Sequence, residues 1–274
     1  MGKQKTPPTS VEVLPNGTKI EFWDSVDAEG NDQQRRYMVN GERFANVTTI
    51  LDVLSKEALL DWAANLAHEG KNWRAVRAEA GERGTLNHHL LLRLLTGEGG
   101  SLADLPEQWR KHGQAGFKFV HRRKPKVREC ERMVAHCGHR YAGRLDLLAE
   151  IDEKLPLVDF KTVTKWSYVK KDGAETEEKY PPFAENLLQL DLYQGARIEC
   201  GLQPAECGLI VRLGPDAEVE ETWVDLDPDR GFKIVETYRA RSEARKVLAD
   251  AAKGQYTKER LDQEIEEQCQ AVGV

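Results

Sequence analysis

Hydrophobic positions recur along this chain with two different periods, which predicts a mixture of strands and helices. Alternating or continuous apolar runs predict strands over residues 18–25, 35–39, 141–151, 155–161 and 209–213. Apolar residues at helical spacing predict helices over residues 55–66, 86–95, 185–199 and 231–270. The central segment is thus mostly β and has helices on either side, which is typical of an α/β fold.

Composition narrows the class of protein. Of the 274 residues, 40% are apolar and 31% are charged, which is typical of a globular chain and excludes a disordered or collagen-like one. No apolar run approaches the roughly 20 residues of a membrane-spanning helix, so we expect no membrane association. The 5 cysteines lack paired spacing, which favours a reducing compartment and hence a cytoplasmic protein. We expect a loose tail over residues 1–10 and a single domain over residues 11–274, because no repeat or long linker divides the chain.

Charge is unevenly distributed in this mildly acidic chain, whose net charge is −6. From Arg110 to Arg144 there are 11 lysines and arginines and only 2 acids, and this stretch includes the basic run at residues 122–126. From Asp216 to Asp229 there are 7 acids and no base. A basic stretch of this kind is typical of a groove for a phosphate backbone, but a solvated charged face explains it equally well.

Three charged residues interrupt the apolar strands of a predicted hairpin. If its turn centres on Asp152-Glu153, Asp146 lies opposite Asp159 with alpha carbons about 5 Å apart, and Lys161 points to the same face. Two carboxylates in an apolar setting repel unless a cation lies between them, and hard oxygen ligands suit Mg²⁺ or Mn²⁺. Such an ion would activate water and Lys161 would stabilise developing charge. The alternative is a salt bridge on a solvated sheet face.

Two predicted helices carry side chains that suit the same site. Gln189 and Tyr193 are four residues apart and share a helix face, where they would contact a phosphate or a bound water. The segment Arg83-Gly84-Thr85 is expected to open a helix that carries His88, a candidate metal ligand. A half-buried polar pair and a structural histidine are the respective alternatives. No Walker motif is present, so we expect no ATP-driven activity.

Together these motifs resemble the RecB-like exonuclease branch of the PD-(D/E)XK nuclease superfamily. Leu145-Asp146 followed by Asp159-Phe160-Lys161 is similar to the core motif, and Gln189-x-x-x-Tyr193 is similar to the helical signature of the branch. Gly84-Thr85-x-x-His88 is similar to its upstream element, and the three motifs occur in the order of the family. Residues 47–51 resemble the lead-in of small phage-type members.

The resemblance implies a restriction-endonuclease-like α/β core, in which a mixed central β-sheet is flanked by helices. It implies a hairpin and helices over residues 11–80, a catalytic core over residues 81–213 and a C-terminal strand and helical region over residues 214–274. It also implies that Lys161, Gln189 and Tyr193 act with the acids in catalysis, and keeps Glu131 as a secondary acidic candidate. The metal ligands that it implies are His88, Asp146, Asp159 and the backbone carbonyl of Phe160.

The implied activity is a Mg²⁺- or Mn²⁺-dependent DNA exonuclease that hydrolyses duplex ends or single strands in recombination, repair or replication. A recombination or annealing protein is an expected partner, and the host cytoplasm is the expected location if the chain is phage-encoded. Residues 170–182 are expected to form a loop over the DNA path. The residues expected to contact the DNA backbone are Arg83, Thr85, Arg122, Arg123, Lys124, Lys126 and Arg144.

Two alternatives stay open. A structure- or sequence-specific endonuclease would use the same scaffold, and a DNA-binding module would keep the site without turning over. Some relatives bind an iron–sulfur cluster through one early cysteine and three clustered late ones. We expect no cluster here, because Cys200, Cys207 and Cys269 are scattered and no cysteine precedes Cys130.

Overall fold

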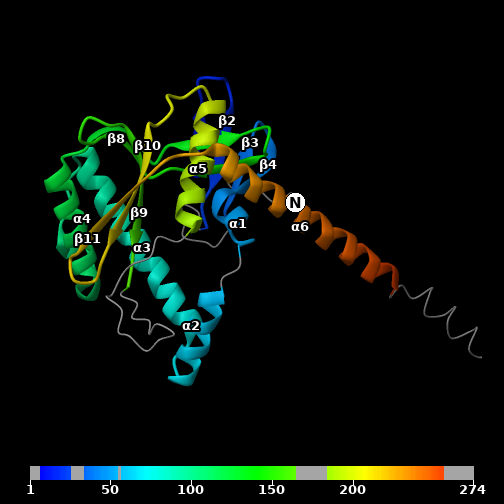
Figure 1. Cartoon of the computed structure of the whole chain (residues 1–274), viewed down its shortest axis with the longest axis horizontal. Helices are drawn as coiled ribbons and strands as arrows, with labels where there is room; N and C mark the ends of the chain where they lie inside the picture. Colours follow the sequence, from blue (N-terminus) through cyan, green and yellow to red (C-terminus); the bar gives the residue numbers. More distant parts are fainter. Residues whose placement is uncertain (1–6, 26–33, 55–56, 165–183, 256–274) are drawn as a thin grey trace, which may run out of the picture.

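The computed structural model describes residues 7–25, 34–54, 57–164 and 184–255. Figure 1 shows two β-sheets with helices packed around them. The expected α/β class, a mixed sheet flanked by helices, is confirmed. The expected loop over residues 170–182 and the end of the C-terminal helix lie outside the described residues.

One sheet has five strands and contains both parallel and antiparallel pairs. In spatial order its strands are β11 (Val219–Val224), β10 (Cys207–Leu213), β9 (Pro156–Thr162), β8 (Leu147–Glu150) and β5 (Lys126–Cys130). β9 and β10 run parallel, and the other neighbours run antiparallel. Four of its strands lie within residues 81–213, the segment expected to be the catalytic core.

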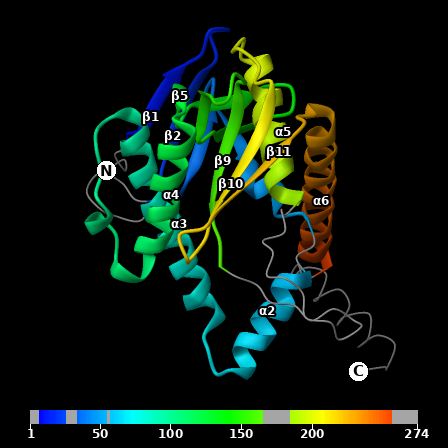
Figure 2. The same ribbon diagram turned by 60° about the vertical axis from the view of Figure 1, so that its left-hand side comes forward.

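Helices cover both faces of the five-stranded sheet because its strands are apolar on both sides. Helices α3 (Trp73–Thr96) and α4 (Arg110–Arg123) pack on one face, where Phe119 contacts the core around Val158. Helix α5 (Ala184–Glu199) packs on the other face, where Leu192 joins the core around Leu157. Figure 2 shows α3 and α4 on one side of β9 and β10, and α5 on the other.

The second sheet has six strands and curls on itself. Its strands are β1 (Ser10–Val13), β2 (Lys19–Trp23), β3 (Arg36–Val39), β4 (Glu42–Asn46), β7 (Tyr141–Arg144) and β6 (Met133–His136). Its inner face buries Phe22, Tyr37 and Met133 in one cluster. A tight hairpin turn at Asn40-Gly41 joins β3 to β4, and both residues have the positive φ values, 49° and 82°, that such a turn requires.

The two sheets are joined by a bent two-stranded ribbon. β5 continues into β6 and β7 continues into β8, and both strands cross between the sheets at the same level. At the crossing, Glu131 N donates to Asp146 O at 3.0 Å, and Glu131 has a left-handed φ of 51°. The single strand predicted over residues 141–151 is therefore wrong, because the ribbon bends at Leu145 and Asp146.

Two helix predictions also need correction. Helix α3 begins at Trp73 after the N-cap Asn72, so Gly84 and Thr85 lie inside it and Thr85 Oγ1 donates to Gly81 O at 3.1 Å. Helix α4 was not predicted, because its buried face is built from small residues. At Gly116 a Cβ atom would lie 2.7 Å from Leu91 Cδ2, so the close approach of α4 to α3 requires glycine there.

The remaining elements frame these layers. They are α1 (Val47–Leu51), α2 (Glu57–His68), the short helices Leu102–Asp104 and Glu107–Trp109, and α6 (Pro228–Gln255). Buried Asp191 in α5 accepts from Arg230 Nε at 2.6 Å and anchors the start of α6, whose far half extends away from the body in Figure 1. Among the described residues, no helix is long and apolar enough to cross a membrane.

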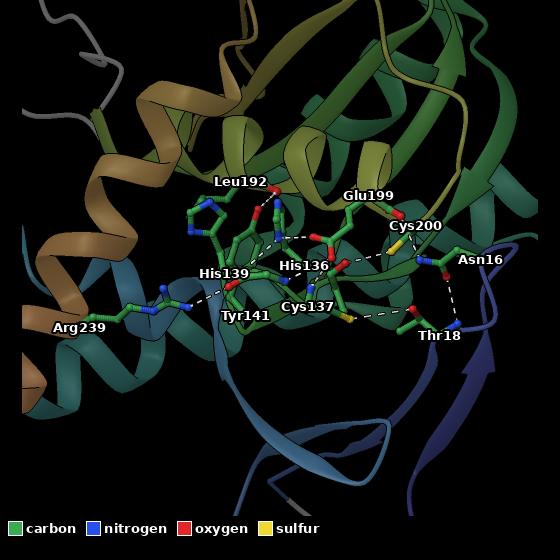
Figure 3. Close-up of polar contacts among 12 residues, drawn as sticks. Asn16, Thr18, His136, Cys137, His139, Tyr141, Leu192, Glu199, Cys200 and Arg239 are labelled. Atoms are coloured by element: carbon green, nitrogen blue, oxygen red, sulfur yellow. Dashed lines mark hydrogen bonds and ion pairs between the residues drawn. The ribbon is translucent and has the colours of Figure 1, made fainter.

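Polar contacts fix the end of α5 to the curled sheet. Glu199 accepts hydrogen bonds from Cys137 N at 2.9 Å and Gly138 N at 3.2 Å and also contacts His136 (Figure 3). Tyr141 Oη donates to the carbonyl of Leu192 at 2.8 Å. Since α5 carries Gln189 and Tyr193, these contacts help to set the position of both side chains relative to the ribbon.

Candidate active site

The predicted pairing of the two aspartates is present in the β8–β9 hairpin. Leu147 pairs with Val158 and Leu148 with Leu157, so one step further along the same register places Asp146 opposite Asp159. Asp146 lies where the ribbon bends into β8, and Asp159 lies in the middle of β9 with 1% of its surface exposed. The bend therefore delivers one carboxylate to a second that is held rigidly inside the sheet.

A histidine and a third acid converge on Asp146, one member of this pair. Ligand atoms of His88, Glu131 and Asp146 all lie within 4.8 Å of one another. Asp146 Oδ2 accepts from Phe160 N at 2.8 Å and lies 3.7 Å from His88 Nδ1. A hollow of about 10 Å³ adjoins these groups, enough for one occupant of atomic size. Residues from α3, the ribbon bend and β9 thus form one small polar site.

The carbonyl of Phe160 also faces this site. His88 Nε2 lies 2.7 Å from Phe160 O. Two adjacent ligands of one octahedral ion at about 2.1 Å would be separated by about 3 Å. Nε2 and the carbonyl are therefore already at the spacing of a pair of metal ligands.

Lys161 connects the aspartates to the helix α5. Its Nζ donates to Asp159 Oδ1 at 2.8 Å and to Gln189 Oε1 at 3.2 Å, and Gln189 Nε2 donates to Tyr193 Oη at 3.1 Å. Burial opposes protonation of Lys161, but the charges of Asp159 and Asp146 outweigh it and hold its pKa above the ordinary value. The four expected catalytic side chains from Asp159 to Tyr193 are thus linked in one continuous chain.

The acids carry more negative charge than their protein partners neutralise. Burial raises the pKa of Asp159 to about 6 even though Lys161 opposes the shift, and burial followed by the charge of Asp146 raises the pKa of Glu131. Asp159 Oδ2 is buried and accepts no hydrogen bond of good geometry, although Lys161 Nζ lies 2.7 Å away. These observations fit a divalent cation, for which carboxylate oxygens and one imidazole nitrogen are suitable ligands.

Glu131 is closer to the centre of this site than its secondary place in the sequence analysis implied. The β5–β8 pairing matches Cys130 with Leu147, so Glu131 continues the register opposite Asp146. The only sequence signal would have been a strand over residues 126–136 paired with residues 141–150. The high charge of that segment hid its strand character, so the position of Glu131 could not be derived.

Three of the expected DNA contacts lie on elements that carry the site. Arg144 Nη1 lies 3.6 Å from Glu131 Oε2, which places this guanidinium at the edge of the acidic cluster. Arg83 is half-buried on α3, its Nε has no hydrogen-bond partner among the described residues, and burial lowers its pKa. Thr85 is exposed and bonds to its own helix.

The basic run at residues 122–126 is not brought to the site. Arg122 and Arg123 both contact Glu221, and Arg123 also contacts Asp152 in the turn of the β8–β9 hairpin. Lys126 Nζ lies 3.6 Å from Glu150 Oε2 at the far end of β8. Glu150 is four positions from Asp146 along the chain, which corresponds to a distance of about 13 Å in a strand.

The likenesses of this chain to solved structures are weak. No family model and no curated protein matches this chain. The chain is similar to the crystal structure of SSO0001, with 16% identity, a TM-score of 0.37 and coverage of 71% of this chain and 74% of that chain. It is also similar to the crystal structure of an alkaline exonuclease, LHK-Exo, from Laribacter hongkongensis, with 15% identity, a TM-score of 0.37 and coverage of 77% and 94%. At this similarity neither structure establishes an activity for this chain.

Proposed function

We propose that this chain is a divalent-metal-dependent deoxyribonuclease of the PD-(D/E)XK type, and that it acts as an exonuclease on DNA ends. The observation that carries the proposal is the convergence of His88, Glu131 and Asp146 next to the Asp159–Lys161 pair. A buried acid cluster of this kind is costly unless a cation compensates it. A divalent cation held there would in turn attract and polarise an anionic phosphodiester.

The chain's own residues have distinct tasks in this reaction. His88, Glu131, Asp146 and Asp159 would hold the ion, with the Phe160 carbonyl as a further ligand. When bound, a divalent ion supplies positive charge that polarises the phosphodiester and lowers the pKa of a water molecule.

Lys161 and the α5 side chains act next to that ion. Lys161 keeps its proton, because its pKa is raised, and presents positive charge at Nζ toward the phosphate. Gln189 orients Lys161 by accepting from Nζ, and Tyr193 fixes the amide of Gln189. Arg144 is suited to contact a neighbouring phosphate of the same strand.

Cleavage of labelled DNA tests the activity and its polarity together. Linear duplex labelled separately at its 5′ and 3′ ends is incubated beside a closed circle, with Mg²⁺, Mn²⁺ or EDTA. We expect loss of linear DNA only, dependent on metal. Asp146→Asn and Lys161→Met should each reduce the rate by about 10²–10³-fold, since each removes charge from the reacting centre.

The matched control is Glu150→Gln, which removes an acid at the opposite end of β8 and should keep most of the activity. Nicking of the circle would replace the exonuclease with an endonuclease on the same site. Full activity of Lys161→Met would remove the proposed mechanism. Binding of DNA without cleavage under any divalent ion would favour a binding module. A recombination or annealing partner and a cytoplasmic location stay predictions from the sequence.

A further inference from the structure

A hollow of about 350 Å³ lies at the curled sheet, lined by β3, β4, α1 and α6. Figure 1 shows these four elements gathered at one side of the molecule. The described lining contains three arginines, Arg35, Arg36 and Arg43, and no acidic side chain. Tyr238 adds a half-buried aromatic ring, and Tyr37 forms the buried floor. The sequence analysis assigned no role to any of these residues.

The arginines are held in place without losing their charge. The guanidinium of Arg36 lies 4.3 Å from the ring centroid of Trp23. Gln34 accepts from Arg36 Nη1 through its carbonyl and from Arg43 Nη1 through Oε1, each at 3.3 Å. Within the described parts of the chain, no carboxylate lies within 4.0 Å of any of the three guanidinium groups. Three arginines around one hollow, without an acid among its described lining residues, create a field that attracts anions.

The hollow lies near the candidate active site. The guanidinium of Arg35 lies 5.5 Å from the centroid of Phe22, and that of Arg144 lies 4.5 Å from the same centroid. Arg144 in turn reaches to 3.6 Å from Glu131 in the acidic cluster. Arg35 and Arg144 thus lie between the cluster and the hollow, and both contact the buried ring of Phe22.

We propose that this hollow binds phosphates of a single nucleic-acid strand that extends from the active site, an inference that rests on the proposed nuclease function. A volume of about 350 Å³ is near the lower end of ligand pockets and suits one nucleotide unit rather than the face of a duplex. Arginine charge combined with aromatic surface is typical of sites that hold single strands without reading their sequence. A strand bound in the hollow would keep its end positioned at the candidate active site between successive cleavage events.

Binding of a fluorescein-labelled 20-nucleotide oligothymidine, measured by anisotropy in EDTA, tests the hollow without cleavage. The variant Arg35→Gln/Arg36→Gln/Arg43→Gln should bind about 10-fold or more weakly at low salt. Its slope of log affinity against log salt should fall in magnitude by about 2, since each single-strand phosphate contact contributes about 0.7. Glutamine keeps much of the side-chain stem, and thermal melting checks that the variant folds.

The matched control is Arg74→Gln/Arg93→Gln/Arg128→Gln. It also removes three positive charges, but at exposed positions outside the hollow, and it should bind like the wild type. The variant Arg35→Lys/Arg36→Lys/Arg43→Lys keeps the charges and should regain most of the salt slope, which separates lost charge from lost fold. Equal loss in the control, or wild-type binding by the glutamine variant, would overturn the proposal.

A separate assay isolates the proposed function from the hollow. The wild type and Asp146→Asn are compared on bis(p-nitrophenyl) phosphate with Mn²⁺, because this small diester is too short to reach from the cluster to the hollow. No metal-dependent hydrolysis of this diester or of DNA would overturn the nuclease while leaving the binding result to decide the hollow. Hydrolysis combined with unchanged oligothymidine binding in the glutamine variant would overturn the hollow alone.

Discussion

Charged side chains differ in burial and in pairing between the two ends of the β8–β9 hairpin. At the turn end, the basic run at residues 122–126 is exposed or half-buried, and three of its side chains contact the acids Glu150, Asp152 and Glu221. At the other end, Asp146 and Asp159 face each other with Glu131 nearby, and burial raises the pKa values of Asp159 and Glu131. Most of the basic run is thus paired with acids at an exposed surface, whereas the acidic cluster is buried.

This difference shows where charge is informative about function. Exposed ion pairs contribute about 0–1 kcal/mol each, so a folded protein can carry many of them with little consequence. Buried charges cost several kcal/mol each unless they are paired or bind a ligand. An acid cluster that stays under-compensated in a stable core therefore indicates a site for a cation, whereas a compensated basic surface does not indicate a site for an anion.

The largest expected effect comes from the ion pair between Arg197 of α5 and Glu129 of β5. Arg197 is fully buried, contacts Glu129 and donates to Gln203 O at 2.6 Å. Arg197→Ala should lower the free energy of unfolding by about 3–5 kcal/mol, because it leaves the Glu129 carboxylate without its partner. Urea denaturation followed by circular dichroism measures this.

The adjacent exposed pair is the control for that change. Arg128 contacts Glu150 at the surface, so Arg128→Ala should cost less than about 1 kcal/mol. Comparable losses in Arg197→Ala and Arg128→Ala would mean that burial does not separate the two kinds of pair, and the contrast between the ends of the hairpin would lose its energetic basis.

The fold was predictable where an element buries a conventional apolar face. β9 and α5 have such faces, and the pairing of Asp146 with Asp159 followed from the position of one turn. Helix α4 escaped prediction because its segment is rich in basic and polar residues and includes two glycines on its buried face. The contact of Gly116 with Leu91 depends on how α3 and α4 pack, which local sequence does not show.

The site was predictable only in part, for a related reason. His88, Asp159 and Lys161 could be singled out because each interrupts an apolar or helical pattern. The position of Glu131 depends on a strand pairing, and the neutralisation of Arg122 depends on Glu221, which is 99 residues away in the chain. Contacts of that sequence separation leave no local pattern.

A smaller effect is expected for Glu131, which the sequence indicated only as a secondary acidic candidate. Glu131→Gln should weaken Mn²⁺ binding by about 10-fold or more, because it replaces a charged oxygen within 4.8 Å of the other two ligand groups. Isothermal titration calorimetry measures the affinity. Glu150→Gln, which removes an acid at the turn end of the same hairpin, should bind Mn²⁺ like the wild type. Equal affinity in both variants would exclude Glu131 from the metal site.

The smallest effect is expected where the compensation of the basic run is removed. Glu221 contacts Arg122 and Arg123 with a side chain that is 7% exposed, so Glu221→Gln releases both guanidinium groups. We expect nucleic-acid affinity to rise about 2- to 5-fold and the salt slope to steepen by about 1, since each added phosphate contact counts in that slope. Glu243→Gln makes the same charge change on an exposed turn of α6 and should do neither. If Glu221→Gln leaves affinity unchanged, the position of the basic run far from the active site, rather than its pairing, is what keeps it from binding the strand.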